Sequence, residues 1–229
     1  MSGIRTALRR LREDQSGLSL SELLIATMLT SIMLVMVGSF FIQTTKLTTS
    51  AAEYRESTGT AANMANAITS VLGVATTLSK AGSEIPDAAI VAGTRSSLTV
   101  YSYANTTASD PAPVKVTFTL DATGKLTETR CTGSKSAGFW TFGTCSATST
   151  RTLGEGLLAP TGTSDQLFTY RNGSGVAYAI GTGSLTASQR EGVSSVIVTV
   201  RVQPDGSSTE PVVIQNTVVL RNLGLETGE

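Results

Sequence analysis

Residues 23–42 read LLIATMLTSIMLVMVGSFFI, a run of 20 residues without a charged side chain. As an α-helix this run would be about 30 Å long, which matches the hydrocarbon thickness of a bilayer. Buried helices of soluble domains are rarely so uniformly apolar over this length. We therefore expect a membrane-embedded helix near the N-terminus.

The two sides of this run differ in charge. Residues 1–17 carry four arginines and two acidic residues, whereas the chain as a whole is balanced, with 17 basic and 17 acidic residues. Because Lys and Arg are enriched on the cytoplasmic side of membrane helices, residues 1–17 are expected in the cytoplasm and the body outside. The apolar stretch is long, and its end, LVMVGSFFIQTTK, offers no convincing small-x-small cleavage site, which disfavours an ordinary secretory signal and leaves a permanent signal anchor as the alternative.

The composition excludes several classes of function. The chain has no histidine, so Ser-His-Asp and Cys-His catalysis and His-ligated zinc sites are excluded within one chain. With a formal net charge of zero and a pI near 6.4, the chain lacks the excess of basic residues that nucleic-acid binding requires. No P-loop, G-x-S-x-G or EF-hand pattern occurs. We therefore expect no catalytic residue, no cofactor and no metal, and nucleic acid is not indicated as a partner.

A carboxylate stands at the start of the apolar run, where residues 17–22 read GLSLSE. An ionisable group such as Glu22 costs free energy in lipid, so its presence there indicates a function. The alternative is a solvated carboxylate at the membrane interface. Residues alone leave both interpretations open.

The whole string resembles the type III signal of prepilins, in which a basic leader ends in Gly and is followed by an apolar residue, a small hydroxyl residue, Leu, any residue and Glu. The resemblance implies cleavage between Gly17 and Leu18 by a prepilin peptidase and N-methylation of Leu18. It also implies that Glu22 neutralises the terminal amine of a neighbouring subunit in a filament. Two positions depart from the usual pattern, because Leu18 replaces Phe and Ser19 replaces Thr.

The helical pattern continues beyond the apolar run. Residues 43–80 contain no proline, and apolar residues recur at steps of three or four with one gap of seven, namely Tyr54, Ala61, Ala65, Ile68, Leu72, Ala75 and Leu78. This amphipathic stripe predicts one helix from about residue 18 to 80, ending before Pro86. The predicted parts are a removed leader (1–17), a transmembrane or filament-core half of the helix (18–42), an amphipathic half (43–82) and an extracytoplasmic β-rich domain (83–229).

The body is predicted to consist of strands and turns. Alternating apolar residues predict strands at Ser97–Tyr103, Val114–Leu120, Lys125–Arg130, Gln166–Arg171, Val193–Val202 and Val212–Arg221. Two antiparallel meanders packed on one long helix follow from this order, an α+β pilin-like fold. The segments LFTYRNG, GVSSVIVTVRV and NTVVLRNL resemble PilW-like minor pilins and J-type minor pseudopilins of type II secretion.

The two cysteines, Cys131 and Cys145, flank a glycine-rich loop. Outside the membrane such a pair most simply forms a disulfide, which in the chain-entropy model contributes about 3 kcal/mol. The spacing is not that of a C-x-x-C redox motif. Phe139, Trp140 and Phe142 lie inside this loop, where they form either a contact surface for another subunit or, as we prefer, a local core.

The expected function is that of a minor pilin or pseudopilin subunit in the priming or tip complex of a type IV pilus or type II secretion pseudopilus. The implied partners are other pilins through the N-terminal helix, the prepilin peptidase and the plasma membrane. The implied location is the inner membrane, crossed once with the N-terminus in the cytoplasm, and then the assembled filament. The alternatives are a major pilin and a signal-anchored surface binding domain that does not polymerise.

Overall fold

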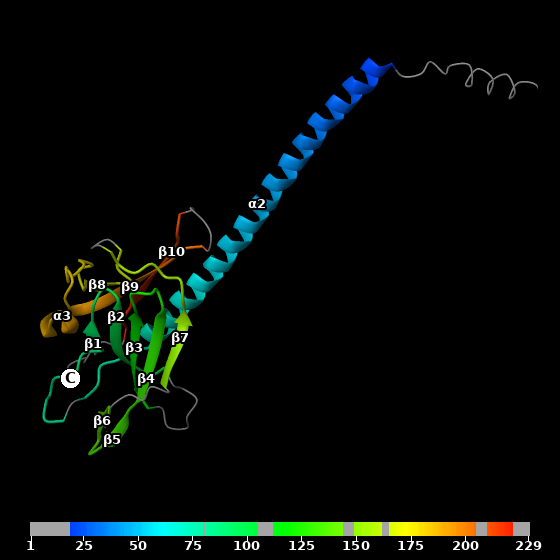
Figure 1. Ribbon diagram of the computed structural model, residues 1–229. Helices are drawn as coiled ribbons and strands as arrows, with labels where there is room; N and C mark the ends of the chain where they lie inside the picture. Colours follow the sequence, from blue (N-terminus) through cyan, green and yellow to red (C-terminus); the bar gives the residue numbers. More distant parts are fainter. Residues whose placement is uncertain are drawn as a thin grey trace, which may run out of the picture. The chain divides into compact units, whose positions relative to one another are not determined.

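The computed structural model describes residues 19–79, 81–104, 112–143, 149–161, 165–204 and 210–221 (Figure 1). The chain divides into two compact units, Met1–Ala51 and Ala52–Glu229. Helix α2 (Leu20–Leu72, 53 residues) supplies the described part of the first unit and continues into the second.

Helix α2 ends at Leu72, so the prediction of a helix to about residue 80 is wrong beyond this point. Gly73, a poor helix former, follows it, although its N–H still donates to the Thr69 carbonyl at 2.9 Å. The next residues bond to strand β2 (Ser97–Ser102) instead. The N–H of Thr76 donates to the carbonyl of Tyr101 at 3.0 Å, and these sheet-like bonds replace the helical ones.

The C-terminal part of α2 buries one stripe in the second unit. Its buried residues are Ala61, Met64, Ala65, Ile68, Val71 and Leu72, spaced at three or four residues for most of the run. The predicted stripe is confirmed over this part. Tyr54 is 51% exposed and does not belong to it, while Ala75 and Leu78 are buried in the segment that follows the helix.

Two antiparallel sheets form the body, as the strand pattern predicted. The five-stranded sheet has the order β1-β2-β3-β4-β7 and the three-stranded sheet has the order β10-β9-β8. Their remaining strands are β1 (Ile90–Gly93), β3 (Val114–Leu120), β4 (Leu126–Thr132), β7 (Thr150–Gly154), β8 (Phe168–Asn172), β9 (Val193–Val202) and β10 (Val212–Val219). A hairpin of β5 (Ser134–Ser136) and β6 (Phe139–Thr141) and the short helix α3 (Ala187–Gly192) complete the described elements.

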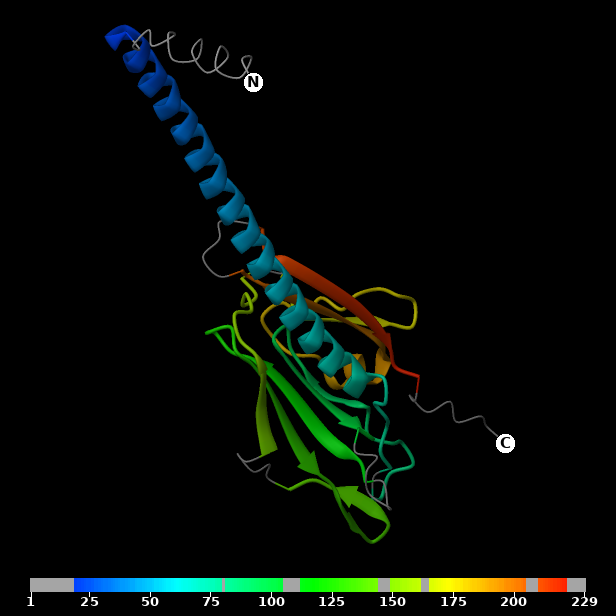
Figure 2. The same ribbon diagram turned by 90° about the vertical axis from the view of Figure 1, so that its right-hand side faces the viewer.

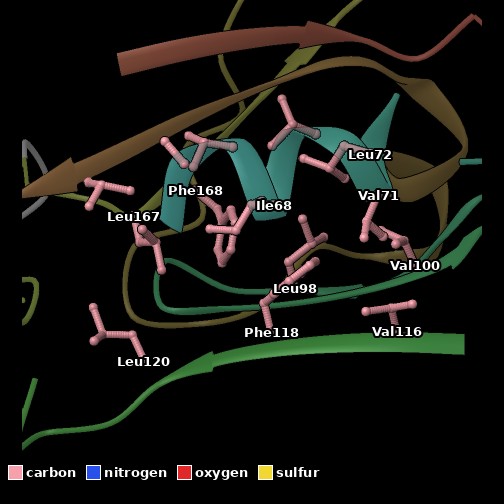
Figure 3. Packing of buried hydrophobic residues seen from close by; sticks show 14 of the residues in the cluster. Ile68, Val71, Leu72, Leu98, Val100, Val116, Phe118, Leu120, Leu167 and Phe168 are labelled. Atoms are coloured by element: carbon pink, nitrogen blue, oxygen red, sulfur yellow. The ribbon is translucent and has the colours of Figure 1, made fainter. Parts of the chain in front are cut away.

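The core lies between the C-terminal part of α2 and the sheets. Figure 3 shows the side chains of Ile68 and Leu72 gathered with those of Leu98, Phe118 and Phe168. All of these side chains have relative exposures of 0%, and full burial of such a residue contributes about 1.5–3 kcal/mol. A helix that packs on antiparallel sheets confirms the predicted α+β class.

Two of the sheet edges are covered by other segments of the chain. At β1, the Gly93 carbonyl accepts from the Leu185 N–H at 2.9 Å, and the Val91 carbonyl accepts from Nη1 of Arg190. At β8, the N–H of Tyr178 donates to the carbonyl of Tyr170 at 2.9 Å. Occupied backbone groups at an edge prevent another chain from pairing there.

Candidate functional site

The first turn of α2 carries the carboxylate that the sequence singled out. Glu22 lies exposed in this turn, and its backbone N–H donates to the hydroxyl of Ser19 at 3.2 Å and to the Ser19 carbonyl at 2.9 Å. Ser19 thus caps the helix, and a carboxylate near the helix N-terminus is stabilised by the helix dipole. This cap was not predicted from the sequence, although Ser-x-x-Glu before an apolar run is a local signal for it.

The predicted processing site precedes this turn. Gly17 and Leu18 lie outside the described residues, so cleavage between them and methylation of Leu18 stay predictions. What the structure adds is that α2 begins at Leu20, two residues after the predicted new N-terminus. A processed chain would therefore enter the helix almost at once.

The first part of α2 is an exposed apolar surface. Its most apolar window has a mean hydropathy of 2.2, and none of that window is buried within the protein. Leu29 and Phe40, for example, are 62% and 72% exposed. Contiguous exposed apolar surface of this extent marks a membrane or protein interface, and the helix is long and apolar enough to cross a bilayer.

The hydroxyl residues inside this surface are compatible with lipid. Thr27 donates to the Leu24 carbonyl at 2.9 Å, Thr30 to the Ala26 carbonyl at 2.7 Å, and Ser31 to the Thr27 carbonyl at 2.8 Å. Each hydroxyl proton is therefore satisfied by the helix's own backbone. An unsatisfied donor in hydrocarbon would cost several kcal/mol, on the order of 4–8 on a cyclohexane scale, and these contacts avoid that cost.

The cysteine loop is only partly described. Cys131, at the end of β4, is 7% exposed and disulfide-bonded. Cys145, its predicted partner, lies outside the described residues, so the pairing stays a prediction. Between them the β5–β6 hairpin turns through Ala137 and Gly138, both with positive φ (50° and 89°), which is the pattern of a two-residue type I′ turn.

The aromatic residues of this loop are half-buried and differ in their contacts. The ring of Phe142 stacks on that of Tyr101 with centroids 5.0 Å apart, and Nζ of Lys115 lies 5.8 Å from the same ring. Nζ of Lys135 lies 5.7 Å from the ring of Trp140 within the hairpin. Phe142 is thus part of local packing beside β2, as preferred above, whereas Trp140 packs against its own hairpin.

Described residues of the second unit line hollows on its surface. One of about 360 Å³ is lined by residues that include Asp87, Tyr101 and Arg190. Burial, and next the negative charge of Asp87, raises the pKa of Tyr101, while Arg190 acts in the opposite direction. Arg190 itself holds the carbonyl of Val91, so its evident task here is to cover the β1 edge.

The second hollow, of about 370 Å³, includes Glu53, Glu56 and Glu155 in its lining. Among the residues that the structure describes, no group of three or more His, Cys, Asp or Glu side chains is placed to hold a metal ion. We assign this hollow no chemistry.

Comparison with known proteins finds no family model that matches this chain and no curated protein that matches it. The function is therefore argued from the chain's own features. These are the short string at the start of α2, the exposed apolar part of that helix and the helix-on-sheet body.

Proposed function

We propose that this protein is a minor pilin-like subunit that takes part in assembly of a type IV pilus or type II secretion pseudopilus, in its priming or tip complex. The observation that carries the proposal is the placement of the GLSLSE string (residues 17–22) where a 53-residue helix begins, so that its last three residues, Leu20 to Glu22, open that helix. That helix leaves its first part exposed and apolar. Its last part packs on β-sheets, a combination that suits a subunit held in a membrane and then in a filament.

The N-terminal residues have assigned roles in this proposal. A prepilin peptidase cuts between Gly17 and Leu18 on the cytoplasmic side, and the new amine of Leu18 is methylated and stays cationic. Within a filament, Glu22 of one subunit neutralises such an amine on another. An unpaired charge among apolar helices would be costly, so this pairing sets the axial register of the subunits.

The location follows from the same features. The arginines of the leader keep the N-terminus in the cytoplasm, and the body lies outside the inner membrane before it enters the filament. The disulfide at Cys131 supports an oxidising environment for the body. The role is structural, with other pilins and the prepilin peptidase as partners and with no catalytic residue, cofactor or metal.

The test is mass spectrometry of the N-terminal peptide of the membrane-extracted protein. The expected peptide begins at Leu18, with one methyl group on its amine. A peptide that retains residues 1–17, from cells with an active prepilin peptidase, would overturn the proposal. The protein would then be a signal-anchored surface domain.

A further inference from the structure

Strand β10 has a long outer edge, and Figure 2 shows the strand in orange-red. It pairs with β9 over eight consecutive residues without a bulge. Beyond its end, the N–H of Leu220 donates to the carbonyl of Ser194 at 2.9 Å. Because alternate residues of an antiparallel strand point their N–H and C=O groups in opposite directions, the even-numbered residues bond to β9. The backbone groups of Val213, Gln215, Thr217 and Val219 therefore point away from β9.

No described strand lies beside those outward groups, since β10 ends its sheet. Natural edge strands are usually protected by charges, prolines, bulges or covering segments. At β1 and β8 other segments occupy the edge, and β7 carries Arg151 and a register shift. Residues 212–219 read VVIQNTVV, which offers neither charge nor proline nor glycine.

The strand is also nearly symmetric about Asn216. Residues 212–220 read VVIQNTVVL, so that Val213 corresponds to Val219, Ile214 to Val218, and Gln215 to Thr217. Two copies of such a strand that run antiparallel about a twofold axis at Asn216 place like beside like on each face. Valines and isoleucine meet aliphatic residues, and polar Gln meets polar Thr, which are favourable cross-strand pairs.

We propose that a second copy of this chain pairs with the first through β10, which joins the two three-stranded sheets into one. The outward backbone groups of Val213 then bond to those of Val219 in the second copy, and those of Gln215 to Thr217. The even-numbered residues form the intervening non-hydrogen-bonded pairs, with Asn216 opposite its own copy on the twofold axis. Such a self-complementary contact is isologous and closes at two subunits.

The near-symmetric order of side chains about Asn216 selects a second copy of this chain as the partner. A strand of another protein would also find free backbone groups, but the mirror order of side chains about Asn216 has value only for a copy that presents the same order. Val213 and Val219 are 54% and 57% exposed, and this pairing would cover both. The inference does not rest on the proposed function, because it uses only the second unit.

The first test introduces single cysteines into the full-length chain in its host membrane. With Asn216→Cys the two thiols face each other in a non-hydrogen-bonded pair, with Cβ atoms about 4.5–5.5 Å apart, close to disulfide range. With the matched control Gln215→Cys the two thiols are diagonal neighbours about 7–8 Å apart. Mild oxidation should give a covalent dimer of the first variant at a yield roughly tenfold above the second.

Equal cross-linking of the two variants, or no cross-linked dimer of Asn216→Cys, would overturn the proposal. A cross-link from Asn216→Cys to a different protein would overturn it as well, because the edge would then serve another partner. The wild-type chain carries the two native cysteines and sets the background for all lanes.

The second test measures the dimer constant of the detergent-solubilised chain by sedimentation equilibrium. Thr217→Lys places a charge on the outer edge twice per dimer and should weaken association at least about tenfold. Thr199→Lys, on the neighbouring strand β9 directly opposite Gln215, adds the same charge one strand inward and should leave it unchanged. A dimer that survives Thr217→Lys would be held by helix α2 instead and would overturn the proposal. The N-terminal peptide in either variant still reports on the proposed function separately.

Discussion

The carboxylate of Glu128 on β4 accepts a hydrogen bond from Nε of Arg151 on β7 at 2.6 Å, although the Glu128 side chain is fully buried. Its other oxygen accepts from Nε of Arg130 on the same strand. On the neighbouring strand β3, the residue directly opposite Glu128 is the core residue Phe118. One buried charge thus joins the edge strand β7 to the rest of the five-stranded sheet.

Neutralising this carboxylate should destabilise the second unit. In Glu128→Gln the two guanidinium groups lose their counter-charge, and the free energy of unfolding should fall by about 1–3 kcal/mol, at the lower end because both arginines reach solvent. Urea unfolding of the detergent-solubilised protein measures this loss. The matched control is Glu155→Gln, since Glu155 pairs with Lys125 at the surface with a side chain 68% exposed. Equal effects of the two variants would contradict a structural role for the buried pair.

A methyl group at Gly124 should be strongly destabilising. Gly124 has a φ of 81°, and a Cβ there would lie 2.3 Å from the backbone oxygen of Leu157. Left-handed backbone costs a non-glycine residue about 1–2 kcal/mol, and the clash adds to it. Gly156→Ala isolates the first cost, because Gly156 has a φ of 79° and no atom within 4 Å of the added Cβ.

Thermal unfolding of both alanine variants measures the difference. We expect Gly124→Ala to unfold at a clearly lower temperature than Gly156→Ala. Identical midpoints would show that the close approach of the Leu157 backbone to Gly124 does not restrict which residue this position accepts.

The turn between β3 and β4 should make stability depend on acid pH. Asp121 accepts from the hydroxyl of Thr123 at 2.6 Å and from the N–H of Lys125 at 3.0 Å, and these hydrogen bonds lower the pKa of Asp121 below its ordinary value of 3.8. A carboxyl with a lowered pKa in the folded state stabilises the fold above its ordinary pKa. This contribution is lost as the pH falls through the lowered value.

The measurement is the unfolding midpoint of Asp121→Asn against the wild type from neutral pH to below pH 3.8. The wild type should be the more stable at neutral pH, and the difference should shrink in acid. Glu84→Gln, which changes an exposed carboxylate outside this turn, serves as the control. A difference that does not change with pH would contradict the prediction.

The proposed role of Glu22 can be separated from helix capping. Glu22→Ala should leave cleavage before Leu18 intact but reduce co-purification with partner pilins, because the neighbouring amine loses its counter-charge. Ser19→Ala removes the side-chain cap seen at 3.2 Å and costs the helix about 0.5–2 kcal/mol, yet it keeps the carboxylate. If Ser19→Ala impairs co-purification as much as Glu22→Ala, the effect belongs to the start of the helix and not to charge pairing.

The sequence by itself determined those features whose signal is local. The uncharged run at 23–42 predicted the exposed apolar helix, and alternating apolar residues predicted β3 and β9 at their observed bounds. Spacing in the helix likewise identified the buried stripe from Ala61 to Leu72. Of the candidate site, Glu22 was predicted from its unusual position and its role stays a prediction, whereas the cap formed by Ser19 was overlooked despite a local pattern.

The tertiary structure alone decided the conformation or burial of those residues whose local sequence pattern competes with contacts from distant parts of the chain. Apolar residues within 73–79 continue the helical spacing, yet α2 ends at Leu72. The N–H of Thr76 donates to the carbonyl of Tyr101 instead of to a carbonyl of the helix. From its residue type Glu128 is expected at the surface. It is buried because Arg151, on a strand that the sequence did not predict, lies beside it and pairs with its carboxylate. Likewise, the near-symmetry of residues 212–220 gains meaning only because β10 ends its sheet. In the first two cases the outcome depends on a hydrogen-bonding group that lies far away along the chain. In the third it depends on the lack of a described strand beside β10. A local sequence pattern reports neither.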